Sequence, residues 1–184
     1  FFTGSHATGL RIAQAVAPKL LKLQLELGGK DPTYVRADAD PLAAAESLAD
    51  GAMYNTGQSC CSVERIYVHE SLHDAFVEHV VATVKAMRQG DPLDEATYIG
   101  AITRAPQLAV LQAQVEDALA KGATLRCGGR IRPGPGNWFE PTVLTGVNHT
   151  MELMREESFG PIIGIQKVSG DAEAVALMND TRYG

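Results

Sequence analysis

Two side chains in this sequence, a carboxylate and a thiol, have the types and surroundings of a covalent-catalysis site. Glu26 precedes a Gly-Gly pair, and Cys60 follows a Gly-Gln-Ser run after the next predicted helix. A cysteine attacks a carbonyl carbon as the thiolate, and an activated water must then release the acyl group that it has captured. A carboxylate can be the base that activates this water. The pair therefore predicts acyl chemistry, provided that the fold brings both side chains together.

Each residue also has an ordinary interpretation. Most free cysteines are small buried apolar residues, and we expect Cys61 and Cys127 to be packing residues or bystander thiols. Glu26 alone would be a strand-end carboxylate in solvent or in a salt bridge. For Cys60, a turn after a helix would expose backbone amides, which lower the pKa of a thiol and can donate to an oxyanion. For Glu26, the Gly-Gly turn would allow its carboxylate to point into a pocket.

Four segments, in this order, resemble motifs of the aldehyde dehydrogenase superfamily. Residues 2–5 resemble its nicotinamide-side turn, and residues 26–30 resemble its Glu-Leu-Gly-Gly-Lys motif, which carries the glutamate base. Residues 57–60 resemble its Gly-Gln-x-Cys motif, which carries the nucleophile. Residues 156–161 resemble its Glu-Glu-x-Phe-Gly-Pro motif. The resemblance covers the whole chain and implies the family's catalytic-domain fold.

The resemblance implies a role for each candidate residue. Cys60, rather than the adjacent Cys61, is implied to be the nucleophile, and Glu26 is implied to be the base. Glu157 is implied to hold the ribose hydroxyls of the nicotinamide cofactor, and Phe159 to pack on the nicotinamide ring. The other implied cofactor-binding residues are Gly4, Ser5 and Leu27.

These cofactor contacts have ordinary alternatives as well. Gly4 and Ser5 could simply begin a helix, since serine is a favoured cap. Glu157 could be a loop acid and Phe159 a core aromatic residue. We expect Lys30, which ends the glutamate motif, to have a structural role.

The activity implied by the resemblance is oxidation of a small-molecule aldehyde to a carboxylic acid with NAD or NADP. The Cys60 thiolate would form a thiohemiacetal, which would expel hydride to the nicotinamide and leave a thioester. Glu26 would then activate water, which favours hydrolysis over transfer to coenzyme A. The residue that distinguishes NAD from NADP would lie upstream of this sequence. For the full-length protein we expect a homodimer or homotetramer.

Two other classes of function stay open. A cysteine-dependent esterase or hydrolase would need a histidine near the sulfur, and residues 59–62 do not match the surroundings of a papain-like cysteine. A non-catalytic fragment with a structural or binding role is the second. An ester-hydrolysis assay with and without nicotinamide cofactor separates the first class from a dehydrogenase.

Composition excludes several partners. The chain has 184 residues, 45% of them hydrophobic, so it can bury a core. Its net charge of −6 disfavours nucleic acid and anionic membranes, which select basic patches. No apolar run approaches the ~20 residues that span a bilayer. The histidines lack ligand spacing, so no metal site is predicted. Three cysteines, two of them adjacent, do not predict a disulfide framework and suit a reducing, cytoplasmic compartment.

Helix and strand patterns alternate along the chain, which predicts an α/β fold with a largely parallel sheet flanked by helices. Ser5, Asp40 and Asp171 are predicted helix caps, and Ser71 opens a capping box with Asp74. Helices are predicted over residues 5–17, 40–52, 71–90, 106–122 and 171–178, and strands over residues 23–27, 65–68, 125–127 and 162–168.

The resemblance also predicts a domain boundary near Gly29. Residues 1–29 would be the C-terminal tail of a dinucleotide-binding domain, and residues 30–184 a catalytic domain that is incomplete at its C-terminus. The chain lacks an initiator methionine and a signal peptide, so we expect an internal fragment. We expect this fragment alone not to oxidise aldehydes, because half of the cofactor site would be missing.

Overall fold

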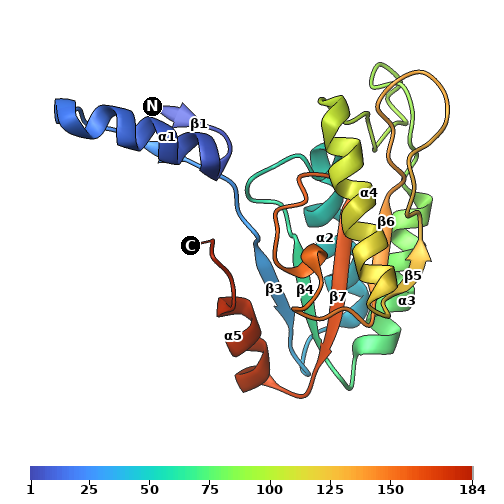
Figure 1. The fold of residues 1–184 in the computed structure, drawn as a ribbon. Coiled ribbons are helices and arrows are strands. Elements are labelled where there is room, and N and C mark those ends of the chain that lie inside the picture. Colours follow the sequence, from blue (N-terminus) through green and yellow to red (C-terminus); the bar gives the residue numbers. More distant parts are fainter. Residues whose placement is uncertain (184) are drawn as a thin grey trace.

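A five-stranded sheet forms the centre of the molecule (Figure 1). The computed structural model describes residues 1–183. The strands stand in the order β3-β4-β7-β6-β5, and all neighbours are parallel except β5 and β6. The predicted α/β fold with a largely parallel sheet is therefore confirmed. The strands are β3 (Pro32–Val35), β4 (Arg65–His69), β5 (Thr124–Cys127), β6 (Thr142–Thr145) and β7 (Ile162–Val168).

Helices cover both faces of this sheet. The first face carries α2 (Pro41–Met53) and α3 (His73–Ala86), and the second carries α4 (Ala105–Ala120). Side chains alternate between the two faces of a strand. In β4, Ile66 and Val68 accordingly pack with α2 and α3, while Tyr67 packs with α4. The strand is buried on both faces, as its apolar sequence predicts. The last helix, α5 (Asp171–Asn179), lies beside β3 at the edge of the sheet (Figure 1).

Helix α2 begins where the sequence predicts it. The Asp40 carboxylate accepts hydrogen bonds from the backbone N–H groups of Leu42, at 2.9 Å, and Ala43, at 3.4 Å. Pro41 occupies the first helical position, where a missing N–H costs nothing. The helix ends in a 3₁₀ turn, Tyr54–Gly57, that leads directly to Cys60. The capped start of α2 therefore fixes where the thiol-bearing loop begins.

A small β-α-β unit at the N-terminus lies apart from the central sheet (Figure 1). Strands β1 (Phe2–Thr3) and β2 (Leu25–Glu26) pair in parallel, and the register places Thr3 beside Glu26. Between them, helix α1 (His6–Val16) is capped by the Ser5 hydroxyl, which accepts from the Thr8 N–H at 3.4 Å. The predicted cap at Ser5 is confirmed, and the predicted strand over residues 23–27 is shorter than expected.

Two predicted caps are wrong. The side chain of Ser71 bonds His69 Nδ1 at 2.8 Å instead of capping α3, whose N-cap position is Leu72. Asp171 lies inside the first turn of α5 and accepts from the Tyr34 hydroxyl at 3.0 Å, so the tertiary contact replaces the local one. Helix α3 also ends at Ala86, before the predicted residue 90. Within residues 1–183, none of the helices combines the length and the apolar character that crossing a membrane requires.

Candidate active site

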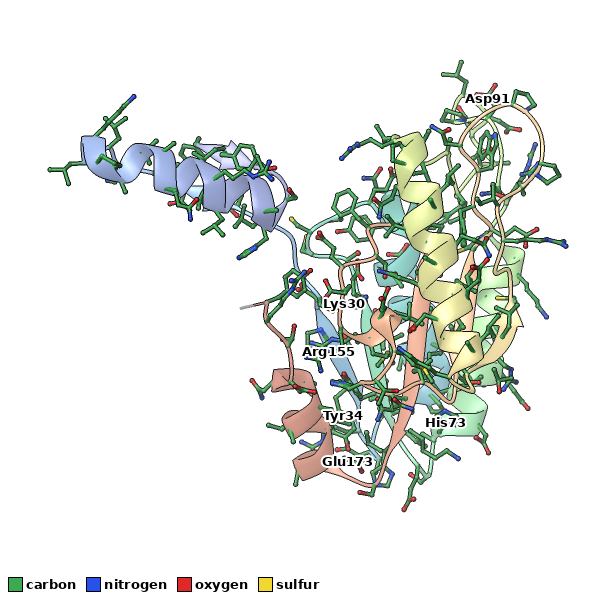
Figure 2. All side chains as sticks on the ribbon, viewed as in Figure 1. Lys30, Tyr34, His73, Asp91, Arg155 and Glu173 are labelled. Atoms are coloured by element: carbon green, nitrogen blue, oxygen red, sulfur yellow. The ribbon has the colours of Figure 1, made fainter. Side chains whose placement is uncertain are left out.

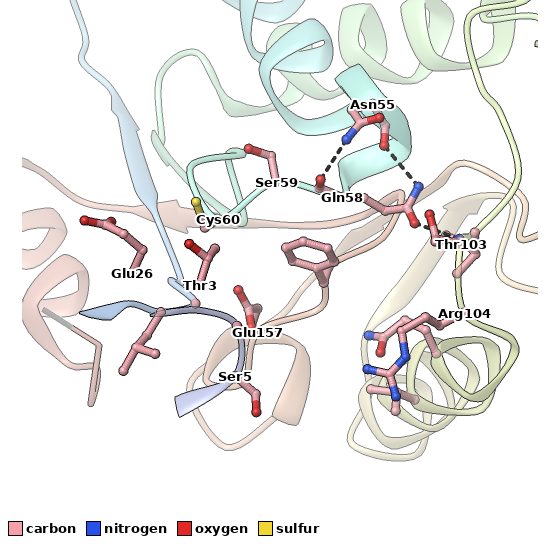
Figure 3. A pocket seen from close by; sticks show the side chains of 17 residues that line it. Thr3, Ser5, Glu26, Asn55, Gln58, Ser59, Cys60, Thr103, Arg104 and Glu157 are labelled. Carbon is pink, nitrogen blue, oxygen red and sulfur yellow. Dashed lines mark hydrogen bonds between the residues drawn. The ribbon is translucent and has the colours of Figure 1, made fainter. Parts of the chain in front are cut away.

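A cavity of about 700 Å³ contains both candidate catalytic residues (Figure 3). Cys60 and Glu26 line the same space, and Figure 3 shows them on one side of it together with Thr3. The volume lies within the usual range of small-molecule sites. The structure thus brings together the two groups that the chemistry needs. The five candidate cofactor-binding residues also line the cavity: Gly4, Ser5, Leu27, Glu157 and Phe159.

The sheet order explains why these distant segments meet. The Glu26 segment leads into β3, the Cys60 segment into β4, and the Glu157 segment into β7. These three strands are adjacent and parallel. Segments that precede adjacent parallel strands reach the same edge of a sheet, here its amino edge. Open α/β sheets more often bind ligands at the carboxyl edge, so strand topology alone would have placed the site at the wrong end.

The loop before Cys60 has an unusual backbone. Asn55, Thr56 and Gly57 all have positive φ angles, of 49°, 60° and 68°. A Cβ atom on Gly57 would come within 2.2 Å of the Gly160 carbonyl oxygen, so only glycine fits there. Left-handed residues other than glycine are strained and persist only where the surroundings hold them. The loop is therefore a rigid support for the thiol, pressed against the segment that carries Phe159.

Gln58 fixes this loop to the chain ahead of α4. Its side-chain nitrogen donates to the Ala101 carbonyl at 3.3 Å, and its side-chain oxygen accepts from the Thr103 N–H at 2.8 Å. A third bond, from the Asn55 side chain to the Gln58 carbonyl at 2.8 Å, closes the turn from within. The glutamine of the motif is thus explained by anchoring, and the wall formed by residues 101–103 is held against the cysteine loop.

The Gly28-Gly29 pair allows two other segments to approach. A Cβ atom on Gly28 would lie 2.2 Å from the Glu157 carboxylate, and one on Gly29 would lie 2.7 Å from the Cys60 carbonyl oxygen. Neither glycine has a positive φ. The expected turn geometry is therefore not the reason for these glycines. They are needed because Glu157 and the Cys60 backbone come close to this strand end from two sides.

The Glu157 carboxylate is half-buried, and one of its two oxygens accepts a hydrogen bond. Its Oε1 accepts from the Gly29 N–H at 3.1 Å. Burial raises the pKa of Glu157, while the Gly29 amide acts in the opposite direction and the nearby Glu64 raises it further. Since the side chain points into the cavity (Figure 3), its second oxygen is available to a ligand. Phe159 offers an apolar surface in the same cavity, with 37% of the residue exposed.

The two adjacent thiols differ in acidity, in the opposite sense to the expectation for Cys60. Burial raises the pKa of the Cys60 thiol, and the neighbouring Cys61 raises it further; a backbone hydrogen bond lowers it by less. Hydrogen bonds between the Cys61 sulfur and the Ser59 and Tyr54 hydroxyls, at 3.3 and 3.4 Å, lower the pKa of Cys61. The backbone hydrogen bond does lower the pKa of Cys60, as expected, but partial desolvation of this exposed thiol and its neighbour Cys61 outweigh it, so that the net shift of the pKa is upward.

We expect Cys61 to react with iodoacetamide before Cys60 in the cofactor-free protein at pH 7.5. Only the thiolate is alkylated, so the more acidic of two exposed thiols is the faster, here by at least about 3-fold. Peptide mass spectrometry after limited labelling measures the order. Tyr54→Phe removes one hydroxyl that bonds the Cys61 sulfur and should narrow the difference in labelling rate between the two thiols. Equal or faster labelling of Cys60 would contradict the assignment of the two pKa shifts.

A buried carboxylate that the sequence analysis missed holds the three segments together. Glu64 Oε2 pairs with Lys30 Nζ at 2.5 Å, and the Lys30 side chain is fully buried. The Glu64 carboxylate also accepts from the backbone N–H groups of Ser158, at 2.9 Å, and Phe159, at 3.0 Å. Phe159 has a left-handed backbone with φ of 49°, which these bonds hold in place. Figure 2 shows Lys30 where the chain enters β3.

Lys30 therefore has the surroundings of a structural residue. Burial lowers the pKa of its ammonium group, and the Glu64 carboxylate opposes this shift. Its remaining contact is the Ser158 hydroxyl at 3.0 Å. One signal in the sequence could have indicated the pair. Glu64 and Arg65 are charged residues at the start of an apolar strand, and a charge buried there must have a partner.

We expect Glu64→Gln to lower the free energy of unfolding by about 3–5 kcal/mol, because it leaves the Lys30 charge buried without a counter-ion. Urea denaturation of the full-length protein measures the loss. Glu78→Gln is the matched control, since it makes the same chemical change on an exposed face of α3 and should cost less than about 0.5 kcal/mol. Equal losses in the two variants would show that the ion pair contributes nothing.

The remaining cavity wall comes from the start of α4. Thr103, Arg104 and Gln107 line it, and Gln107 is fixed by a 2.6 Å bond from its side chain to the Ser158 carbonyl. These three residues are not predictable from the sequence, because nothing in the α4 sequence marks which turn faces a cavity in the folded chain. Within residues 1–183, no group of three or more His, Cys, Asp or Glu side chains could hold a metal ion.

Comparison with known proteins identifies a family for this chain. The model of the Aldehyde dehydrogenase family matches residues 1–184. A succinate-semialdehyde dehydrogenase [NADP(+)] of Mycolicibacterium paratuberculosis is 38% identical over 182 residues, which are 99% of this chain and 39% of that protein. A betaine aldehyde dehydrogenase of Brucella anthropi is 39% identical over 186 residues, covering 99% of this chain and 38% of the relative.

The fold similarity is equally extensive. The crystal structure of succinate-semialdehyde dehydrogenase from Burkholderia pseudomallei superposes with a TM-score of 0.96 at 38% sequence identity. The match covers 100% of this chain and 38% of that structure. The chain thus spans between 38% and 39% of the length of these three proteins.

Proposed function

Because the chain belongs to the aldehyde dehydrogenase family, we propose that it carries the thiol, the water-activating carboxylate and part of the cofactor site of an NAD(P)-dependent enzyme that oxidises an aldehyde to a carboxylic acid. The observation that carries this proposal is that Cys60 and Glu26 line one cavity together with Glu157. The chain covers 39% of one such relative, so the activity of the whole protein is part of the proposal.

In the proposed reaction, the Cys60 thiolate attacks the aldehyde carbon and forms a carbon–sulfur bond. The aldehyde oxygen becomes an oxyanion, for which the backbone N–H of Cys60 is the proposed donor. When bound, the nicotinamide supplies the hydride acceptor, so that a thioester is left on Cys60. Glu26 then takes a proton from water, the resulting hydroxide attacks the thioester carbon, and the carbon–sulfur bond breaks to give the acid and the free thiol.

The cavity suits the nicotinamide half of NAD or NADP. Glu157 has one carboxylate oxygen free for the vicinal ribose hydroxyls, and the exposed face of Phe159 offers an apolar surface to the ring. Gly4, Ser5 and Leu27 are proposed to complete this wall. The name of the 38% identical relative specifies NADP(+), which supports a nicotinamide dinucleotide as the cofactor.

We propose that residues 1–29 belong to a dinucleotide-binding domain and residues 30–184 to the catalytic domain. The separation of the β1-α1-β2 unit from the central sheet in Figure 1 supports a boundary near Gly29. The proposed cofactor site then lies between the two parts, since residues from both line the cavity. For the full-length enzyme we propose a homodimer or homotetramer, which light scattering would measure.

A cysteine hydrolase is the weaker interpretation of the same cavity. Such enzymes rely on a histidine that takes the proton of the thiol. The 17 residues that line the cavity include no histidine. The cavity instead offers Glu26 as the base. A base that activates water is what a dehydrogenase needs to hydrolyse the thioester after hydride transfer.

The direct test is a rapid-quench experiment on the full-length enzyme with an aldehyde and NAD(P)⁺. We expect cofactor reduction together with a thioester on the peptide that contains Cys60, identified by mass spectrometry. Added coenzyme A should not become acylated, because water is the proposed acceptor. Turnover without cofactor reduction would favour a hydrolase, and an acyl group on any other residue would refute the assignment of the nucleophile.

A further inference from the structure

The cavity has one positively charged side chain. Among the residues of the described chain that line it, only Glu26, Glu157 and Arg104 carry a charge. The two carboxylates repel an anion, and the chain as a whole has a net charge of −6. Among the charged side chains of the described wall, Arg104 is therefore the one that would attract a negatively charged group of a ligand.

The Arg104 guanidinium is free to bind such a group. Its side chain is exposed and makes no hydrogen bond or salt bridge within residues 1–183. Arg65, by contrast, is fully buried and donates to the Lys30 carbonyl at 2.9 Å and to the Leu177 carbonyl at 3.2 Å. A guanidinium presents donors in a planar fork that matches phosphate and carboxylate oxygens. The N–H donors of Arg104 are therefore all available to a ligand.

The backbone on both sides of Arg104 is held firmly. The Thr103 N–H donates to Gln58 at 2.8 Å, and the Gln107 side chain donates to the Ser158 carbonyl at 2.6 Å. Arg104 itself has an extended backbone at the start of α4, and its side chain does not cap the helix. The positive end of the α4 dipole adds to the guanidinium charge on this side of the cavity. The backbone of Arg104 is therefore held beside the cysteine loop, and its guanidinium can reach a ligand from there.

The order of groups across the cavity matches the order of groups in a nicotinamide dinucleotide. Figure 3 shows Cys60 on one side, Arg104 on the opposite side, and Glu157 between them. In the cofactor the nicotinamide ring is joined to a ribose, and the ribose to the phosphates. A ring near Cys60 and ribose hydroxyls at Glu157 place the next group, a phosphate, towards Arg104.

We propose that Arg104 binds a phosphate oxygen of the nicotinamide dinucleotide, on the side of the ribose opposite the nicotinamide ring. This inference rests on the function proposed above, because it uses Glu157 as the ribose ligand. A carboxylate on the aldehyde substrate has the same chemistry as a ligand for a guanidinium. The experiment therefore has to separate the two sources of the anion.

The test compares Arg104→Ala, Arg104→Lys and the control Arg126→Ala in the full-length enzyme. Arg126 is exposed on β5 and does not line the cavity, so its loss changes the net charge equally. Loss of a charge-assisted bond should raise the KM for NAD(P)⁺ about 10-fold or more in Arg104→Ala, and less in Arg104→Lys, which keeps the charge. Arg126→Ala should leave this KM within about 2-fold.

Two further measurements identify the anion. Calorimetric binding of nicotinamide mononucleotide, which has a phosphate, should weaken in Arg104→Ala, whereas binding of nicotinamide riboside, which has none, should not change. Equal effects on both ligands, or none, would overturn the proposal. A higher KM for a carboxylate-bearing aldehyde but not for a neutral one of equal length would also overturn it and assign the anion to the substrate. These binding measurements are independent of the thioester experiment. The phosphate contact of Arg104 and the proposed aldehyde oxidation can therefore be refuted separately.

Discussion

Replacement of Cys60 by alanine is expected to lower kcat/KM for aldehyde oxidation at least about 10³-fold in the full-length enzyme. The methyl group cannot form a covalent bond to the aldehyde carbon, and without the thiohemiacetal there is no tetrahedral oxyanion to expel the hydride. NAD(P)H absorbance at saturating aldehyde measures the loss. The substitution only removes the sulfur atom from an exposed side chain, so the loop should keep its conformation.

Cys61→Ala is the matched control for this prediction. Its sulfur lies on the next residue and bonds the Ser59 and Tyr54 hydroxyls, but Cys61 does not line the cavity. We therefore expect its activity to stay within about 3-fold of the wild type. The reverse result, an active Cys60→Ala and an inactive Cys61→Ala, would show that Cys61 is the nucleophile. Near-normal activity of both variants would exclude covalent catalysis by either thiol.

The comparison of the two cysteines shows what the sequence can and cannot predict. The motif around Cys60 was sufficient to predict that it shares a site with Glu26, and the cavity contains both. The acidity of the thiols was not predictable in this way. It depends on how far each sulfur is buried and on the Ser59 and Tyr54 hydroxyls, whose positions follow from the 3₁₀ turn.

Patterns that depend on neighbours in sequence were mostly predicted well, although the capping box at Ser71 was not, since Ser71 bonds His69. The caps Ser5 and Asp40 and the buried strands β4 and β7 all follow from local residue types. Strands β1, β3 and β6 have two to four residues each, too few to show a period. They are strands because the sheet supplies their hydrogen-bond partners. The predicted cap at Asp171 failed because of a tertiary contact as well, since the Tyr34 hydroxyl on β3 donates a hydrogen bond to the Asp171 carboxylate.

Residues that act through tertiary contacts were the ones missed in the site. Glu64 bonds Lys30 and two backbone amides that lie far from it in sequence, and no periodicity reports such a contact. Arg104 is one of many charged residues at a helix start, and only the folded chain shows that it faces the cavity. Reactive groups are easier to identify from a single sequence than the groups that position them. Reactivity depends on residue type, whereas positioning depends on the fold.

Replacement of Glu26 by glutamine is expected to stall the reaction after hydride transfer. Glutamine has nearly the same shape, so the strand pairing of β2 with β1 should persist, but its amide cannot take a proton from water. General bases contribute about 10²–10⁴-fold, so we expect the steady-state kcat to fall at least about 100-fold. A rapid first turnover should still produce NAD(P)H, because formation of the thioester on Cys60 does not need Glu26.

Hydroxylamine separates this outcome from a general loss of activity. It attacks a thioester without a general base, so it should restore turnover in Glu26→Gln and give a hydroxamic acid, whereas it cannot restore Cys60→Ala. Glu46→Gln makes the same change on an exposed face of α2 outside the cavity and should behave as the wild type. A Glu26→Gln enzyme with no first turnover and no response to hydroxylamine would mean that this carboxylate acts before the thioester forms, for example by deprotonating the Cys60 thiol, whose raised pKa would make such a base useful.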